Sequence, residues 1–452
     1  MASTRSRSLV HLLATLTVFT AFAGQFWRNL LDWWGFGIIA GICILGAAVA
    51  LAVLRPRLEW RRVPKALLAF VGLCTLSIAW SFYPAASLIG VGIQLGTAVT
   101  GVFLALCLSY AELIRALAAA FRWILVLSLL FEAWVAIVVR GPVLPFWVDY
   151  GEPPYPKAFY WSRGLLLDGG PIEGIVANRN LLGFIALLAL LVFVVQLVEG
   201  TVRRGWAIFW VVVAAVVFAL TRSTTVILAL VVVAAALGFA LWARSRGAER
   251  RRPVYLTAAA SVVAVVVLLI TLNGALLKLF GKSEDLTGRF DIWNAVIGLA
   301  QQRPVAGWGW MGYWAPWVEP FDGLAVRKGV TYLQAHNAWL DVWLQVGIIG
   351  LVIFIALVGS TLWRSWFAAV DRPRTGISDT DPYTARSLLP LLILAALLAQ
   401  SLAESRILYE GGWMLVVALC IITKRAQYSA VEAPDAASAP VSSVSSDSGR
   451  MR

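Results

Sequence analysis

Charged residues, histidine and cysteine are all scarce in this chain of 452 residues. Only 13% of the residues are charged, whereas 60% are hydrophobic. A soluble domain carries about 25% charged and roughly 45–50% apolar residues. Backbone groups in lipid must hydrogen-bond internally, so long apolar runs without polar alternation form transmembrane helices rather than strands. The composition therefore excludes an ordinary soluble domain and predicts an all-α, polytopic transmembrane helix bundle.

The shortage of metal-ligating side chains limits cofactor chemistry. His11 and His336 are the only histidines, and the four cysteines lie singly inside apolar runs, without the spacing of a zinc site. We interpret these cysteines as small buried hydrophobes. The only Asp-x-Asp sequence, at 379–381, stands beside a proline in a loop that the charge distribution below assigns to the cytoplasm. We therefore expect neither a metal ion nor another cofactor.

Twelve apolar runs are candidate membrane spans. The first follows Arg5 and Arg7 in the manner of a signal peptide, but it is long and a second run follows at once, so we retain it as a helix. The runs cover approximately residues 9–26, 33–54, 65–82, 86–108, 116–139, 174–198, 206–220, 223–243, 254–272, 338–363, 387–403 and 410–424.

The positive charge predicts the orientation of the bundle. The chain has 37 Lys and Arg against 24 Asp and Glu, an excess that would also suit nucleic acid. The excess lies in short loops between spans, however, and every strong arginine cluster falls on one side when the N-terminus is cytoplasmic. We therefore expect no nucleic-acid partner, a multi-pass protein of the inner (cytoplasmic) membrane with both termini cytoplasmic, and a disordered tail over 429–452.

Two long loops then face outward, 140–173 and 273–337. Within the second, residues 289–302 show apolar side chains at helical spacing, which predicts an amphipathic helix at the membrane interface. The segment GWGWMGYWAPW, residues 307–317, follows it. Its glycines disfavour a helix, and its aromatic side chains are typical of an interfacial belt.

Three residues on the outer side could carry chemistry. His336, just before the tenth span, can accept a proton from a hydroxyl, although it could equally be an interfacial histidine bonded to a loop carbonyl. Arg222 lies in a tight turn beside a helix start and suits a diphosphate, or else anchors lipid headgroups. Arg289 opens the interfacial helix, and its alternative is a salt bridge to Asp285 or Asp291.

Two charged residues fall inside apolar spans. We expect Glu132 and Arg179 to lie at similar depth near the outer side, where they can pair, and that pair would serve structure as readily as function. Glu404 and Arg406, in the last outer loop, are weaker candidates.

Four stretches follow one another between about residues 174 and 360: GIVANRNLLGF, LTRSTTVILAL, LTGRFDIWNAVIGLAQQRPVAGWGWMGYW and HNAWLDVWLQVGIIGLVIF. In their order, spacing and common side they resemble the O-antigen ligase and polymerase superfamily, the WaaL- and Wzy-like membrane glycosyltransferases. On this resemblance we divide the chain into N-terminal spans one to five with the first outer loop, 1–173; a ligase-like core, 174–363; the last two spans, 364–428; and the tail, 429–452.

The resemblance implies a GT-C-like fold and transfer of a glycan from a polyprenyl-diphosphate donor to a lipid or other surface acceptor, with inversion and without a metal. It implies diphosphate-binding arginines at Arg222 and Arg289 and a catalytic histidine at His336. The family often has Glu where this chain has Gln345, which leaves that acid's role open unless Asp341 replaces it. We expect contacts to sugar or acceptor from Trp308, Trp310, Tyr313, Trp314 and Asn337. The alternative for the aromatic residues is an interfacial belt.

Four functions compete. A ligase moves a finished glycan onto a surface acceptor, and a Wzy-type polymerase joins repeat units from the same kind of donor. A lipid-linked glycan transporter would need charges along the whole bundle, whereas here they cluster in the outer half. A non-catalytic scaffold or receptor is the fourth.

Overall fold

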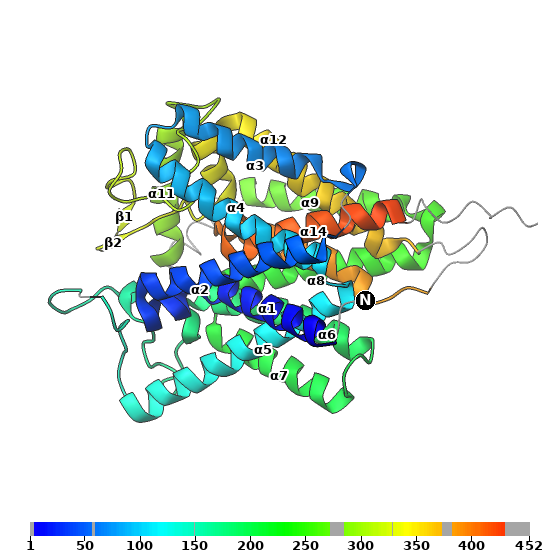
Figure 1. The fold of residues 1–452 in the computed structure, drawn as a ribbon, viewed down its shortest axis with the longest axis horizontal. Coiled ribbons are helices and arrows are strands. Elements are labelled where there is room, and N and C mark those ends of the chain that lie inside the picture. The colour runs from blue at the N-terminus through cyan, green and yellow to red at the C-terminus, as the bar shows by residue number, and fades with distance from the viewer. Residues whose placement is uncertain are drawn as a thin grey trace, which may run out of the picture.

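The computed structural model describes residues 4–56, 59–148, 150–271, 284–327, 329–372 and 382–429, and these form a helical bundle (Figure 1). One short hairpin, β1 (Val326–Arg327) with β2 (Val330–Thr331), is antiparallel. The helices are α1 (Thr4–Phe22), α2 (Gly24–Leu54), α3 (Lys65–Leu76), α4 (Pro84–Cys107), α5 (Tyr110–Trp134), α6 (Arg179–Val198), α7 (Arg204–Thr221), α8 (Thr224–Arg246), α9 (Arg252–Thr271), α11 (Glu284–Ala300), α12 (Ala338–Val370), α13 (Leu389–Ser401) and α14 (Glu410–Ser429).

The structure confirms an all-α, polytopic membrane protein. Among the described residues, seven helices are long and apolar enough to cross a membrane: α2, α4, α5 with the π-turn that follows it, α6, α7, α8 and α12. Each of the other expected runs also coincides with a helix, namely α1, α3, α9, α13 and α14. Seven spans are therefore supported by length and composition, and the full count of twelve stays a prediction.

Some predicted boundaries are wrong. The sixth span begins at Arg179 rather than near residue 174, because residues 174–176 form a separate short 3₁₀ turn and the Asn178 side chain caps α6. The helix expected over 289–302 begins earlier, at Glu284, and ends at Ala300. The tenth span continues as α12 to Val370.

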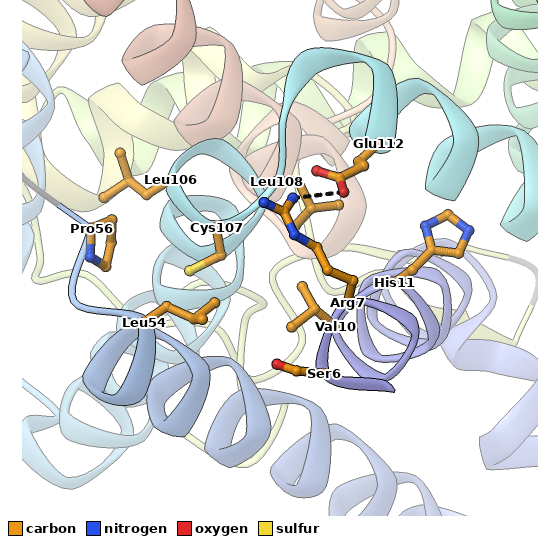
Figure 2. Close-up of a pocket in the computed structure, with 10 residues that line it drawn as sticks. All are labelled: Ser6, Arg7, Val10, His11, Leu54, Pro56, Leu106, Cys107, Leu108 and Glu112. Atoms are coloured by element: carbon orange, nitrogen blue, oxygen red, sulfur yellow. Dashed lines mark hydrogen bonds and ion pairs between the residues drawn. The ribbon is translucent and has the colours of Figure 1, made fainter. Parts of the chain in front are cut away.

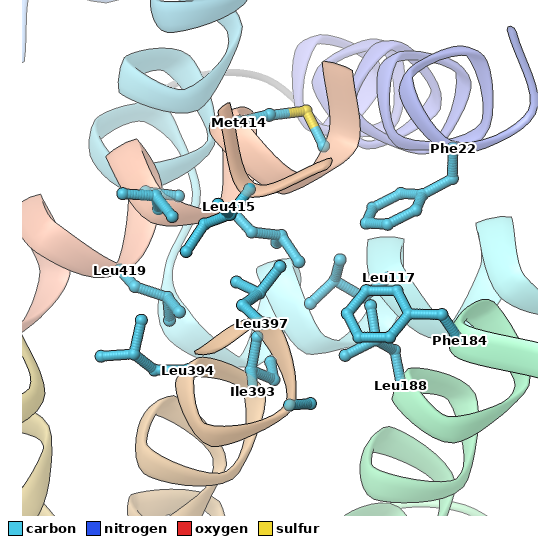
Figure 3. Close-up of a cluster of buried hydrophobic side chains, with 14 of the residues drawn as sticks. Phe22, Leu117, Phe184, Leu188, Ile393, Leu394, Leu397, Met414, Leu415 and Leu419 are labelled. Carbon is cyan, nitrogen blue, oxygen red and sulfur yellow. The ribbon is translucent and has the colours of Figure 1, made fainter. Parts of the chain in front are cut away.

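The centre of the bundle is formed by α6, α13 and α14. Their apolar side chains meet those of α1 and α5 in one buried cluster, in which Phe184, Leu188, Leu397, Met414 and Leu415 lie close together (Figure 3). In surface helices such as α7 and α8, only 28% of the residues of the most apolar stretch are buried. That distribution suits helices whose outer faces meet lipid.

The polar groups gather at two ends of the bundle. One end, which we call the basic end, contains the ion pairs Arg7–Glu112 at 2.9 Å and Arg251–Asp371 at 2.5 Å. The other, which we call the loop end, carries the segment before α6, the described residues between α11 and α12, and the turn before α14. In Figure 1 the β hairpin marks the loop end at the left and the chain start lies toward the right.

Candidate active site

Glu404 organises a polar network at the loop end. It lies in the turn after α13, and only 6% of its surface is exposed. Its Oε2 lies 2.8 Å from Nδ1 of His336, and its Oε1 accepts a hydrogen bond from Nη2 of Arg289 at 3.0 Å. The amide of Asn180 donates to the same Oε1 at 3.4 Å. One carboxylate therefore joins residues from three distant parts of the chain.

The Glu404 contact decides which nitrogen of His336 can act as a base. A carboxylate accepts hydrogen bonds, so the neutral imidazole carries its proton on Nδ1 and leaves a lone pair on Nε2. The His336 ring also meets the edge of Tyr332, with centroids 5.3 Å apart. His336 has a φ of 50°, in the left-handed region, which few residues other than Gly adopt, although Asn, Asp and His adopt it more often than the rest. Such backbone strain persists where the surroundings fix it and is typical of functional sites.

Glu404 remains ionised over the whole physiological range. Burial alone raises the pKa of this carboxyl, but the facing His336 and then Arg289 and Arg406 outweigh burial and lower the pKa from 4.5 to about 2. The carboxylate can thus hold the imidazole in one tautomer and stabilise the imidazolium that forms when His336 takes a proton.

Arg222 reaches this network through its neighbour in the chain. Arg222 ends α7 with a φ of 47°, and Ser223 caps α8 by accepting a hydrogen bond from Val226 N–H. The Ser223 hydroxyl donates to Asn180 Oδ1 at 2.8 Å, and Asn180 in turn binds Glu404. The Arg222 side chain is exposed beside Gly169, and within the described chain no hydrogen bond or ion pair holds its guanidinium.

Two of the predicted site residues, His336 and Arg289, therefore bind one carboxylate. The third, Arg222, is joined to it only through the hydrogen bonds of its neighbour Ser223. Arg289 pairs with Glu404, although the sequence suggested Asp285 or Asp291 as alternative partners. Sequence reasoning ranked Glu404 as a weaker candidate and missed Asn180. The signal that could have raised Asn180 is its place in the ANRN sequence at the start of a predicted span, where a polar side chain needs a partner.

Asn337 has a local structural role. Its side-chain oxygen accepts from the backbone N–H groups of Trp339 and Leu340, which caps α12, and its amide donates to the Leu402 carbonyl at 3.4 Å. The cap fixes the direction in which α12 leaves His336. A contact from Asn337 to sugar or acceptor would have to replace these bonds.

The aromatic segment before α12 is packed inward, which corrects the expectation for two of its residues. Trp310 is 0% and Trp314 is 2% exposed, so neither can stack on a sugar. Both are buried because Gln345 on α12 holds this segment, accepting from Met311 N–H at 2.9 Å and from Gly312 N–H at 3.0 Å. At the position where the family often has Glu, this chain thus has a neutral side chain that binds backbone.

The other predicted sugar contacts are partly buried. Trp308 donates from its indole to the Leu299 carbonyl at 3.0 Å. Tyr313 accepts from Arg406 Nη1 at 3.0 Å, and burial raises the pKa of the Tyr313 phenol far above its usual value. Contact of these two side chains with a glycan stays a prediction.

Arg406 belongs to a second ion-pair group beside Glu404. Its guanidinium binds Glu410 at 2.8 Å, and Arg28 lies 3.6 Å from the same carboxylate. Burial lowers the pKa of Arg406, but Tyr313, Glu410 and Glu404 more than offset this, so the guanidinium stays charged. Arg406 therefore keeps positive potential behind the Glu404 carboxylate.

Glu132 is 1% exposed and binds the backbone of the segment before α6. Its Oε1 accepts from the N–H groups of Glu173 and Gly174, and its Oε2 accepts from the Ser162 hydroxyl at 2.8 Å. These three donors satisfy the buried carboxylate. Arg179 is the half-buried first residue of α6 and not a residue inside the span, so their expected pairing stays a prediction.

A cavity of about 190 Å³ lies elsewhere, at the basic end, between α1, α2, α4 and the start of α5 (Figure 2). The Arg7–Glu112 pair and His11 line it, together with apolar side chains such as Leu54 and Leu106. None of the predicted site residues lies there. We therefore define the candidate site by its hydrogen bonds and charges and not by this cavity.

Metal ligands were not expected, and within the described ranges no group of three or more His, Cys, Asp or Glu side chains is arranged to hold a metal ion. The Asp379-x-Asp381 sequence and residues 430–452 of the predicted tail lie outside the described residues.

Comparison with known proteins finds a family match over the part of the chain that carries the predicted site residues. Residues 207–355 match the family model Wzy_C, described as O-antigen ligase. The match confirms the resemblance to the O-antigen ligase and polymerase superfamily. The matched range includes Arg222, Arg289 and His336, whereas Asn180 and Glu404 lie outside it. A comparison with curated proteins finds no match for the chain.

Proposed function

Because its core matches the O-antigen ligase family, we propose that this membrane protein is a glycosyltransferase that uses a polyprenyl-diphosphate-linked glycan as donor. In this proposal the loop end faces outside the cytoplasm, both termini are cytoplasmic, and the twelve spans form a GT-C-like bundle in the inner membrane. The observation that carries the proposal is the bond between His336 Nδ1 and the Glu404 carboxylate, with Arg289 on the same carboxylate.

The His336–Glu404 pair supplies the base. Nε2 of His336 accepts the proton of the acceptor hydroxyl, and the hydroxyl oxygen attacks the anomeric carbon of the donor glycan. The bond between that carbon and the diphosphate oxygen breaks, and its electron pair leaves with the polyprenyl diphosphate. Attack opposite the leaving group inverts the anomeric centre. The ionised Glu404 stabilises the imidazolium until the proton passes to water.

The arginines supply the charge that the leaving group requires. The Arg222 guanidinium is exposed, has no partner among the described residues and stands at the N-terminus of α8, where the N–H groups also favour an anion. Arg289 binds the same carboxylate as His336, so its guanidinium lies closer than Arg222 to the imidazole that takes the proton. Preorganised cations stabilise charge that develops as the sugar–phosphate bond breaks, and the donor bond is already activated.

The proposal is tested by glycan transfer with purified protein in detergent, with lipid-linked glycan as donor and product measured by mass spectrometry. His336→Asn keeps a residue that tolerates the left-handed backbone but removes the base, so kcat falls by roughly 10²–10⁴-fold. Arg222→Lys keeps the charge but loses the planar fork, so the donor KM rises while kcat changes less. Full activity of His336→Asn would remove His336 from the mechanism.

Ligase and polymerase differ in their products. Cells that lose a ligase accumulate full-length lipid-linked polymer, whereas cells that lose a polymerase retain only single repeat units. We favour the ligase because the family model that matches residues 207–355 is described as O-antigen ligase. The length distribution of lipid-linked glycans in cells with and without the protein decides between ligase and polymerase. If neither full-length polymer nor single repeat units accumulate, a transporter or a scaffold is favoured.

A further inference from the structure

Asp341 is a fully buried carboxylate in the first turns of α12, with 0% of its surface exposed. Its Oδ1 accepts from the indole N–H of Trp314 at 3.0 Å. Its Oδ2 accepts from the backbone N–H of Ala335 at 3.0 Å and from the hydroxyl of Ser405. Three donors offset the cost of burying the charge.

Two of these donors stand next to the reacting residues. Ala335 immediately precedes His336, and Ser405 immediately follows Glu404. The single oxygen Oδ2 of Asp341 therefore ties together the two chain segments whose side chains meet in the imidazole–carboxylate bond. Gln334 adds a parallel link, since its Oε1 accepts from Ser405 N–H at 3.3 Å.

The strained backbone of His336 explains why such a tie is needed. A φ of 50° is unfavourable for histidine and persists only where neighbouring contacts fix it. The Asn337 cap holds the chain after His336, and Asp341 holds the chain before it. Without the second contact the ring is free to turn away from Glu404.

We propose that Asp341 is a positioning residue that holds His336 and Glu404 in their reacting geometry through the backbone of Ala335 and the hydroxyl of Ser405. This inference rests on the proposed function of His336 as the base. Asp341 is buried beneath the site, so it acts through its neighbours and not on the substrate.

The test is Asp341→Asn in the full-length protein, with the transfer assay described above. An amide has one acceptor oxygen in place of two, so on whichever side its nitrogen lies it meets a donor, and the three hydrogen bonds of Asp341 cannot all be kept. A misplaced reacting pair lowers kcat by about 10–100-fold, whereas the donor KM stays within about twofold because no bond of Asp341 reaches Arg222 or Arg289. A purely structural role would instead lower the amount of folded protein and leave kcat per folded molecule unchanged.

Glu112→Gln is the matched control. Oε2 of Glu112 also accepts from one backbone N–H and one hydroxyl, both of Ser109, at 2.8 Å each, but at the basic end. Gln at this position can still cap the helix but loses the charge that pairs with Arg7, which lowers stability slightly without altering kcat or the donor KM. Equal losses of kcat in Asp341→Asn and Glu112→Gln would overturn the inference.

Ser405→Ala is the second variant, because an amide at the buried position of Asp341 can prevent folding. It retains the carboxylate and two of its donors, so kcat falls by a few fold without a change in donor KM. Combined in one chain, Ser405→Ala and Asp341→Asn cost less than the sum of their separate effects, since both act on one contact.

The outcomes separate this inference from the one on which it depends. If His336→Asn is inactive while Asp341→Asn or Ser405→Ala keeps the full kcat, Asp341 is not a positioning residue and the proposed function stands. If the unaltered protein transfers no glycan, the proposed function itself fails and this inference fails with it.

Discussion

At the scale of single residues, Glu404 combines three tasks. It orients the imidazole of His336, pairs with Arg289 and receives the Asn180 amide that leads to the α7–α8 turn. A carboxylate can accept several hydrogen bonds at once and keep its charge when cations surround it. An amide of the same shape carries no charge and has only one acceptor oxygen, so it cannot accept from Arg289 and hold the proton of His336 Nδ1 with two separate oxygens.

Glu404→Gln is expected to lower kcat by roughly 10²–10⁴-fold, because the imidazole loses both its fixed tautomer and its counter-charge. The substitution conserves volume, so the protein remains folded near neutral pH. Initial rates of glycan transfer measure the effect. Rates equal to those of the unaltered protein would show that His336 does not need this carboxylate.

The same variant changes the pH dependence of stability. The pKa of Glu404 is lowered from 4.5 to about 2 in the fold, so its carboxylate contributes stability above pH 4.5 that is lost as the pH falls through about 2. Melting temperatures measured between pH 6 and pH 2.5 should therefore fall more steeply for the unaltered protein than for Glu404→Gln. Parallel curves would contradict the lowered pKa.

At the scale of elements, the segment 301–317 is held between α4 and α12. Gln345 binds its backbone from α12, and Gly90 on α4 approaches it so closely that an added Cβ would lie 2.1 Å from the Met311 carbonyl oxygen. The kink of α12 at Gly347 has the same cause, because a Cβ there would lie 2.1 Å from the Val305 carbonyl oxygen. This packing buries the tryptophans that composition alone would place at the interface.

Gly90→Ala is expected to destabilise the protein by about 1–3 kcal/mol, since the new methyl group must displace backbone. Gly92→Ala is the matched control on the same helix, because an added Cβ at Gly92 meets nothing within 4 Å. It should change stability by no more than about 1 kcal/mol, in the favourable direction of helix propensity. Melting temperatures in detergent compare the two, and equal shifts would argue against the close contact with Met311.

At the scale of the whole molecule, the two ends differ in charge and in content. Arginine ion pairs lie at the basic end, whereas the loop end carries the candidate site, the segment that precedes α6 and the described residues between α11 and α12. Positive charge in short loops favours the cytoplasmic side, so we expect the loop end to face outward. Two exposed residues, Trp317 at the loop end and Arg250 at the basic end, allow this to be measured.

A small membrane-impermeant maleimide should label Trp317→Cys in intact cells and label Arg250→Cys only after the cells are permeabilised. Cys43, Cys74 and Cys420 are buried, but Cys107 is partly exposed at the cavity of the basic end, so both variants also carry Cys107→Ser and are compared with Cys107→Ser alone. The reverse pattern would place the candidate site in the cytoplasm, where the proposed reaction cannot proceed.

The sequence by itself determined the helical membrane character and the approximate position of each apolar run, and it predicted the roles of His336, Arg222 and Arg289, which stay predictions. These follow from local properties: hydropathy over about 20 residues, the sign of charge in short loops, and a resemblance carried by contiguous stretches. Local patterns hold because lipid allows a spanning segment few alternatives to a helix.

Only the tertiary structure decided which acid meets the histidine and which aromatics are buried. Glu404 lies 68 residues after His336 in the chain, and Asn180 lies more than 150 residues before it, so no spacing within one helix relates them. Trp310 and Trp314 resemble interfacial residues in the sequence, yet contacts with α4 and α12 bury them. Such pairings depend on how helices pack across the bundle, because a hydrogen bond requires two groups to be close in space, whatever their separation along the chain.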